Sequence, residues 1–220
     1  MIILFGGEKG GTGKTTLATN IAAMLSAKGS DVLLIDTDKQ GSASSWGAIR
    51  ETDSGMRPIP AIQKFGNAVL SAVKDLSKRY DDLIIDAGGR DSIELRAALT
   101  IANKVYIPLQ ASQFDVWTLG AMDKLVEQVK SFNPSLEAYV IINRASPNPS
   151  VTETKETLQI FEDLENLKLT SIIIRDRIAY RKAARSGLSV TEMNPVDQKA
   201  NDEVLAFFEE ICDERKTKAA

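Results

Sequence analysis

The sequence predicts an α/β fold in which one doubly wound, mostly parallel sheet carries helices on both faces. Three observations predict it: short runs that are apolar throughout, amphipathic stretches between them, and a glycine-rich loop directly after the first run. An unbroken apolar run indicates a strand covered on both faces, whereas a strand with one face in water alternates apolar and polar residues. The runs are Ile2–Phe5, Val32–Ile35, Leu83–Ile85, Val105–Ile107, Val140–Ile142 and Ile172–Ile174.

Apolar residues recur at helical intervals in two of the stretches between these runs. They are Leu17, Ile21, Met24 and Leu25 in the first stretch, and Leu119, Met122, Val126 and Val129 in the second. Lys28-Gly29 supplies a stop signal for the first helix. Residues 53–62 are the least regular part and predict a loop that leads to an edge or short strand. Because no repeat or low-complexity linker interrupts the alternation, we expect residues 1–220 to form a single domain.

The composition excludes several kinds of chemistry. The 220 residues contain no histidine, which removes the most common general base and most transition-metal sites. A single cysteine, Cys212, permits neither an internal disulfide nor a cluster of thiolate ligands. The net charge of −3 means that any binding to nucleic acid must come from a local basic patch. The first apolar run is too short for a signal peptide or a membrane span, so we expect a cytoplasmic protein.

The first predicted strand runs directly into the sequence GEKGGTGKTT at residues 7–16, and a helix follows. This order is typical of a phosphate-binding loop, although Glu8 stands where the common pattern has its first glycine. Glycines free the backbone N–H groups to face phosphates, Lys14 neutralises the β- and γ-phosphates, and Thr15 offers its hydroxyl to Mg²⁺. The alternative is a glycine-rich turn that binds nothing.

Three aspartates follow predicted strands. Asp36 and Asp38 come after the second run, and Asp86 after the third. The carboxyl ends of the strands border the ligand crevice in a doubly wound sheet. Asp86 is therefore our candidate to hold Mg²⁺, and Asp36 to support the metal's water shell. Asp38, on a flexible loop, is our candidate to orient the attacking water. The alternative is that these carboxylates only cap loops and helices.

A basic strip follows the last predicted strand. Within eleven residues a single acid, Asp176, stands among five cations, which are Arg175, Arg177, Arg181, Lys182 and Arg185. Arg181 and Arg185 share one face if the segment is helical. Such a strip can bind DNA phosphates without reading bases. The alternative is an ordinary solvated face.

Several of these motifs resemble those of the deviant Walker A ATPases of the ParA/MinD superfamily. KGGTGKTT at residues 9–16 resembles the deviant Walker A motif, DTDKQGSASSW at 36–46 the first switch segment, and LIIDAGG at 83–89 the Walker B motif. VYIPLQASQFD at 105–115 and VIINR at 140–144 resemble two later strand ends. The resemblance covers nearly the whole chain, and it is closest to short ParA-type plasmid partition ATPases that lack an N-terminal helix-turn-helix.

The resemblance implies a P-loop ATPase and assigns its residues. Catalytic roles fall to Lys9, Lys14 and Asp38, and Mg²⁺ contacts to Thr15, Asp36 and Asp86. The implied ATP contacts are Lys9, Gly10, Gly11, Thr12, Gly13, Lys14, Thr15, Thr16, Asn143 and Arg144, the last two at the adenine. A plain strand-end turn is the alternative, above all for Arg144. In the family the extra lysine, here Lys9, reaches the partner subunit's nucleotide, which implies a homodimer held by ATP. A solvated loop lysine, or one that contacts its own nucleotide, is the alternative. Lys39 replaces the usual proline, and DAGG replaces the more frequent D-x-P-P, so the switch geometry stays open.

We therefore predict an ATP-hydrolysing DNA partition protein, cytoplasmic and associated with the nucleoid. Its ATP dimer would bind non-specific DNA through the basic strip, and a ParB-like centromere-binding protein would release it by stimulating slow hydrolysis. The alternatives are a related ATPase that positions a protein cargo, a MinD-like membrane ATPase, and a small-molecule phosphotransferase. Acidic residues separate the apolar positions of the last helix, Val204, Phe207, Phe208 and Ile211. This pattern favours a core role for that helix over a membrane role.

Overall fold

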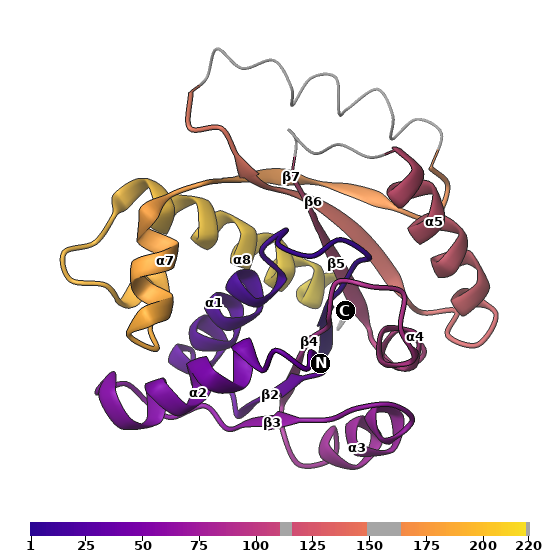
Figure 1. The fold of residues 1–220 in the computed structure, drawn as a ribbon, viewed down its shortest axis with the longest axis horizontal. Helices are drawn as coiled ribbons and strands as arrows, with labels where there is room; N and C mark the ends of the chain where they lie inside the picture. Colours follow the sequence, from indigo (N-terminus) through magenta and orange to yellow (C-terminus); the bar gives the residue numbers. More distant parts are fainter. Residues whose placement is uncertain (111–115, 149–163, 219–220) are drawn as a thin grey trace.

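In a computed structural model, which describes residues 1–110, 116–148 and 164–218, a seven-stranded sheet lies between two layers of helices (Figure 1). The strands are β1 (Ile2–Phe5), β2 (Val32–Asp36), β3 (Ala61–Gln63), β4 (Asp82–Asp86), β5 (Lys104–Leu109), β6 (Glu137–Ala145) and β7 (Lys168–Arg175). Their order across the sheet is β3-β2-β4-β1-β5-β6-β7, and each neighbouring pair is parallel. The predicted α/β fold class is confirmed.

Each face of the sheet is covered by its own helices (Figure 1). One face carries α1 (Lys14–Ala27), α2 (Ser42–Asp53), α7 (Ile178–Arg185), the short 3-10 helix η3 (Val190–Glu192) and α8 (Gln198–Lys218). The other face carries α3 (Ala68–Leu76), α4 (Ile93–Leu99) and α5 (Val116–Lys130). In β1, Ile3 and Phe5 enter the first core and Leu4 enters the second. Because both faces are buried, the strands read as continuous apolar runs.

Most local predictions are confirmed. All six apolar runs lie within strands, and the two predicted helices are α1 and α5. Residues 53–62 lead into β3 at the edge of the sheet. Val204, Phe207, Phe208 and Ile211 of α8 are fully buried, so they belong to the core. Within the described residues no helix is long and apolar enough to cross a membrane. Residues 111–115 of the VYIPLQASQFD segment lie outside the described part of the chain.

The strand order reverses at β1, which lies between β4 and β5. Phe5 at the end of β1 pairs in register with Asp86, and Asp86 with Asp36 of β2, so these strands end at one level. Parallel strands bring their carboxyl ends to one edge, and α/β sheets bind ligands where the order reverses. The glycine-rich loop therefore leaves the sheet at the position expected for a ligand site.

Candidate nucleotide site

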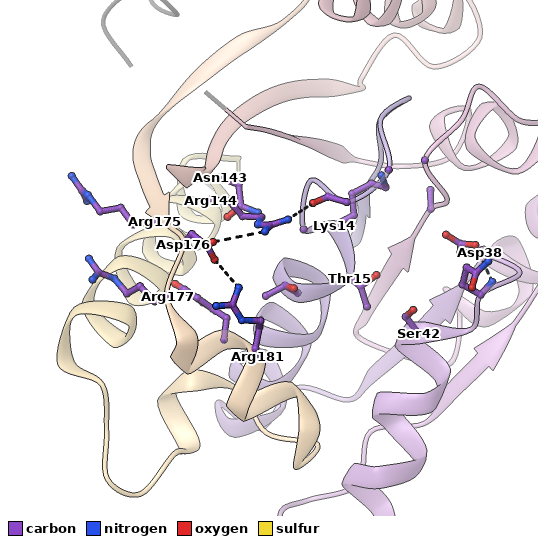
Figure 2. Close-up of a pocket in the computed structure, with 18 residues that line it drawn as sticks. Lys14, Thr15, Asp38, Ser42, Asn143, Arg144, Arg175, Asp176, Arg177 and Arg181 are labelled. Carbon is purple, nitrogen blue, oxygen red and sulfur yellow. Dashed lines mark hydrogen bonds and ion pairs between the residues drawn. The ribbon is translucent and has the colours of Figure 1, made fainter. Parts of the chain in front are cut away.

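A cavity of about 400 Å³ opens at this edge of the sheet (Figure 2). The glycine-rich loop and the start of α1 contribute Gly10, Gly11, Gly13, Lys14, Thr15 and Thr16. Asn143 and Arg144, from β6, line the same cavity, and Thr12 is buried within the loop. The structure thus brings together the predicted phosphate loop and the two predicted adenine contacts, which lie far apart in the sequence.

Three side chains hold the loop by its carbonyl groups. Gln110 Nε2 donates to the Gly11 carbonyl at 2.9 Å, and Arg144 Nη1 donates to the same oxygen at 2.8 Å. Asn143 Nδ2 donates to the Thr12 carbonyl at 2.7 Å. The carbonyl and N–H of one peptide unit point in opposite directions. These bonds therefore turn the neighbouring N–H groups away from the three side chains and leave them for an anion.

Gly13 permits the close approach of Asn143. Its φ is 95°, and a Cβ at this position would lie 2.2 Å from Asn143 Nδ2. A residue with a side chain would meet both a backbone penalty and a steric clash. Arg144 is the one non-glycine residue of the described chain with a positive φ, 53°. A positive φ is uncommon in a residue with a long side chain, and it often marks a functional position.

Lys14 lies at the base of the site, and its side chain is 7% exposed. Its Nζ donates to the Lys9 carbonyl at 2.5 Å, so the two predicted phosphate lysines meet through the loop backbone. Burial lowers the pKa of Lys14, while the negative charges of Asp86 and Asp38 oppose this shift. An anion in the cavity would stabilise the charged form of this lysine.

Asp86 and Thr15 form a pair that fits Mg²⁺. Thr15 Oγ1 donates to Asp86 Oδ2 at 2.6 Å, and the buried Asp86 Oδ1 has no hydrogen-bond partner. Burial raises the pKa of Asp86 to about 7. A buried carboxylate oxygen without a donor is costly unless something cationic reaches it. The described residues hold no group of three carboxylate, thiol or imidazole side chains that could bind a metal alone. Mg²⁺ here would rely on phosphate and water for its other ligands, as it usually does.

Asp36 and Asp38 shape the loop after β2. Asp36 Oδ1 accepts from the N–H of Asp38 at 3.0 Å, and Asp36 Oδ2 from the N–H of Ser44 in the first turn of α2 at 2.9 Å. Both oxygens are therefore in use, which suits support of the metal site better than direct ligation. Asp38 Oδ1 accepts from Gln40 N at 2.9 Å. The Gly41 N–H also donates to the Asp38 carbonyl at 3.0 Å, and the two bonds close a tight turn at Asp38.

A second cavity, of about 500 Å³, adjoins the first and shares Gly10, Asp38, Gln40 and Gly89 with it. Lys39 and Arg90 also line this second cavity. A Cβ at Gly89 would lie 2.6 Å from the backbone of Gly10, so the loop after β4 touches the phosphate loop directly. This contact accounts for glycine in the DAGG segment, where a proline ring would not fit.

The basic strip divides into two parts. Arg175 and Arg177 both bind Glu203 of α8, with Nη1 of Arg175 at 3.1 Å and Nη2 of Arg177 at 2.6 Å from its Oε1. The sequence predicts a strip with a single acid, Asp176. Glu203 adds a second negative charge, so the strip is less basic than predicted. Arg181, Lys182 and Arg185 are exposed on one side of α7, and we call these three the α7 stripe. Arg175, Asp176, Arg177 and Arg181 also line the first cavity, so the strip borders the nucleotide site.

Two functional residues escaped the sequence prediction. Gln110 follows β5 directly, and its position at a strand end was an available signal. Glu203 had no local signal, because it lies on α8, 26 residues beyond Arg177. Only the packing of α8 against β7 brings it to the strip.

The comparison with known proteins agrees with this geometry. Residues 3–190 match the family model described as the CobQ/CobB/MinD/ParA nucleotide binding domain. Two similar proteins are both named maintenance of carboxysome distribution protein A. That of Halothiobacillus neapolitanus is 28% identical over 206 residues, which cover 92% of each chain. That of Gloeobacter kilaueensis is 30% identical over 187 residues, which cover 84% of this chain and 81% of the other.

A solved structure shows the same fold. It is a putative plasmid partition protein of Borrelia burgdorferi B31 bound to AMPPNP, with a TM-score of 0.68 and 22% sequence identity. The superposition covers 99% of this chain and 98% of that one. This chain therefore shares its fold with that protein over nearly the whole length of both.

Proposed function

Since the chain belongs to the CobQ/CobB/MinD/ParA nucleotide-binding domain family, we propose that it is a ParA-type ATPase that positions a cargo by binding DNA in its ATP state. One observation carries the proposal. The cavity that contains Lys14 and Thr15 of the phosphate loop also contains Arg181 of the α7 stripe. A nucleotide in this cavity would therefore lie against both the phosphate-binding residues and the segment proposed to contact DNA.

The loop residues provide the nucleotide site. Backbone N–H groups of residues 10–16 and the start of α1 attract the phosphates, and Lys14 leaves the Lys9 carbonyl to neutralise them. Thr15 and Asp86 would hold Mg²⁺, which neutralises phosphate charge and orients the phosphates. Asn143 and Arg144 contact the loop at the Thr12 and Gly11 carbonyls, and we place the adenine on their side of the cavity.

Hydrolysis and dimerisation involve the other two predicted residues. We place Lys9 across a homodimer interface, where its charge offsets the repulsion between two facing triphosphates. Asp38 orients the attacking water from the turn after β2. Because Asp38 Oδ1 already accepts from Gln40 N, turnover by the protein alone should be slow, and an activating partner would rearrange the turn.

The α7 stripe supplies the DNA contact. Arg181, Lys182 and Arg185 are exposed cations on one short helix, which suits contact with successive phosphates and not with bases. Arg175 and Arg177 contribute less, since both bind Glu203, which offsets one of their two charges. Binding should therefore be independent of base sequence and strongly salt-dependent.

The proposal extends to the identity of the cargo. The names of both similar proteins concern carboxysome distribution, which favours a protein assembly as cargo and a partner protein bound to that assembly. A plasmid or chromosome with a ParB-like partner is the second candidate, because the phosphate-loop and switch motifs resemble those of short partition ATPases. Loss of the protein from its own cells would separate the two: a protein assembly would lose its spacing, or a plasmid would be lost.

Fluorescence anisotropy of a random-sequence duplex tests the biochemical core of the proposal. The protein is titrated with Mg-ATP, with Mg-ADP and without nucleotide, at two salt concentrations. We expect binding with Mg-ATP that weakens with salt, and a clear loss when Arg181 and Arg185 are both replaced by alanine. Exposed Lys74 and Lys78 of the opposite face, replaced together, serve as the charge-matched control. No binding in any state would reject a DNA-based mechanism.

A further inference from the structure

Asp176 joins the phosphate loop to the α7 stripe. Its Oδ2 lies 3.7 Å from Nη2 of Arg144, and its Oδ1 lies 3.4 Å from Nη1 of Arg181. Figure 2 shows these contacts as dashed lines that connect Arg144, Asp176 and Arg181. One carboxylate therefore shares its charge between a residue of the nucleotide site and a residue of the proposed DNA contact.

Arg144 connects Asp176 to the loop itself. The same guanidinium that faces Asp176 donates through Nη1 to the Gly11 carbonyl at 2.8 Å. Arg144 also lines the cavity, so a nucleotide bound there competes for its donors. Any change at this guanidinium alters the charge that Asp176 feels.

Arg181 is the one member of the α7 stripe that also lines the cavity. Its side chain is 59% exposed, and its described acid partner is Asp176. While this pair persists, the charge of Arg181 is partly neutralised and its side chain leans toward the cavity. Lys182 and Arg185 then remain as the outward cations of the stripe.

The two acids of the strip hold their arginines very differently. Glu203 accepts four hydrogen bonds from Arg175 and Arg177, at 2.6 to 3.1 Å, and its side chain is 12% exposed. Asp176 is 38% exposed, and its ion-pair contacts are longer. Exposed pairs of this kind are weak and exchange easily. The Glu203 contacts are fixed, whereas those of Asp176 can respond to a ligand.

We propose that Asp176 is a positioning residue that withholds Arg181 from DNA until a nucleotide enters the cavity. Asp176 lines the same cavity, so the negatively charged nucleotide that binds Arg144 also repels the Asp176 carboxylate. The carboxylate then releases Arg181, and Arg181 turns outward beside Lys182 and Arg185. This inference rests on the proposed function, because it explains how DNA binding at the α7 stripe depends on nucleotide.

The test is Asp176→Asn in the same anisotropy assay, with a salt series, without nucleotide and with a non-hydrolysable ATP analogue plus Mg²⁺. We expect DNA affinity without nucleotide to rise about threefold or more, and the salt slope to steepen by about one, as for one added phosphate contact per subunit. With the analogue bound, affinity should match the wild type. The double variant Asp176→Asn with Arg181→Gln should return the nucleotide-free slope to the wild-type value.

Asp202→Asn, on the exposed side of α8, removes the same charge and is the matched control; its described side-chain contact is with Gln198. It should shift affinity equally in both states. The inference is overturned if Asp176→Asn behaves like Asp202→Asn, or if it changes both states alike. Arg181→Gln alone removes the same pair from the other side, and it must reduce affinity with the analogue more than without it. If the wild type binds no DNA in any state, the proposed function fails together with the inference; if it does bind, only the inference is at stake.

Discussion

Gln110, Asn143 and Arg144 each donate a hydrogen bond to a carbonyl of the phosphate loop. The loop is thus positioned from outside, by side chains at the ends of β5 and β6. Single residues also set its electrostatics, because Lys14 and Asp86 are both buried. Pre-arranged dipoles and charges bind an anion at low reorganisation cost, so changes at single positions should have large effects.

Gly13→Ala should damage the site more than the same substitution at a glycine within a helix. The φ of 95° and the 2.2 Å approach to Asn143 oppose any Cβ. We expect the free energy of unfolding to fall by about 2 kcal/mol, and nucleotide affinity by roughly tenfold or more. Urea unfolding and titration with a fluorescent ATP analogue measure the two effects.

Gly120→Ala is the control, since a Cβ there meets no atom within 4 Å. It should leave nucleotide binding intact and stabilise α5 by about 0.5 kcal/mol. Equal effects of the two substitutions would contradict the assigned role of Gly13.

The ionisation of Asp86 should make Mg²⁺-dependent nucleotide binding sensitive to pH. Its pKa is raised to about 7 by burial, so a proton competes with the metal below that value. Between about pH 8 and about pH 6 we expect the Mg²⁺-dependent part of nucleotide affinity to fall roughly tenfold. Asp86→Asn is the control, because its amide does not ionise and its pH profile shows the titration of the nucleotide alone. Identical pH profiles for the wild type and Asp86→Asn would refute the role of Asp86 in Mg²⁺ binding.

At the scale of elements, α2 is fixed at both ends. Its first turn binds Asp36 through Ser44 N. Near its C-terminal end, Arg50 donates to the Gly187 carbonyl and to both carboxylate oxygens of Glu192. Arg50 is 2% exposed, so this ion pair is largely hidden from water. The helix therefore links the turn that contains Asp38 to the segment that follows α7.

Arg50→Met should destabilise the protein by about 3 kcal/mol, because it leaves Glu192 without its main partner. Burial tends to raise the pKa of Glu192, but the hydrogen bonds from Arg50 and Ser189, together with the charge of Arg50, outweigh it and hold this pKa below the ordinary value. The stabilisation is therefore present above the ordinary pKa of glutamate and is lost as pH falls through the lowered value. Urea unfolding at neutral and acidic pH should show the difference between wild type and variant shrinking on acidification.

Lys78→Met breaks an exposed pair with Asp75, whose atoms are 4.0 Å apart. It should leave the free energy of unfolding unchanged. A similar loss in both variants would mean that Arg50 has no special role.

The sequence predicts elements well where the signal is local. The apolar runs, the Gly-Lys-Thr ending and the helical spacing each depend on a few neighbouring residues. Contacts over long separations were not predictable: Arg50 meets Glu192 across 142 positions, and Gln110 meets Gly11 across 99. Such pairs depend on the register of the strands and on how α8 packs, which no short pattern specifies.

At the scale of the whole molecule, substitution of Lys9 should separate nucleotide binding from dimer assembly. In the proposed dimer it acts on the partner's nucleotide, whereas Lys14 acts on its own. Lys9→Ala should therefore abolish the ATP-dependent dimer and change nucleotide affinity only a few-fold, while Lys14→Ala should abolish nucleotide binding. Light scattering after size exclusion, in the Asp38→Ala background to slow hydrolysis, measures the assembly.

Lys74→Ala, an exposed position on α3, is the control for a lost lysine charge. If the Lys9→Ala protein dimerises normally with ATP, Lys9 does not bridge the subunits and acts only within its own subunit.

The central place of β1 bears on how the protein is made. The ribosome makes β1 before β4 and β5, the strands with which it pairs and which end at Asp86 and Leu109. Phe207 of α8 packs on the rings of Phe5 and Tyr106 and so covers that strand from the far end of the chain. Such non-local pairing makes folding slow, and a nascent chain must keep an apolar strand from aggregating in the meantime. The ability to bind ATP should therefore appear late in synthesis, after most of the sheet has emerged.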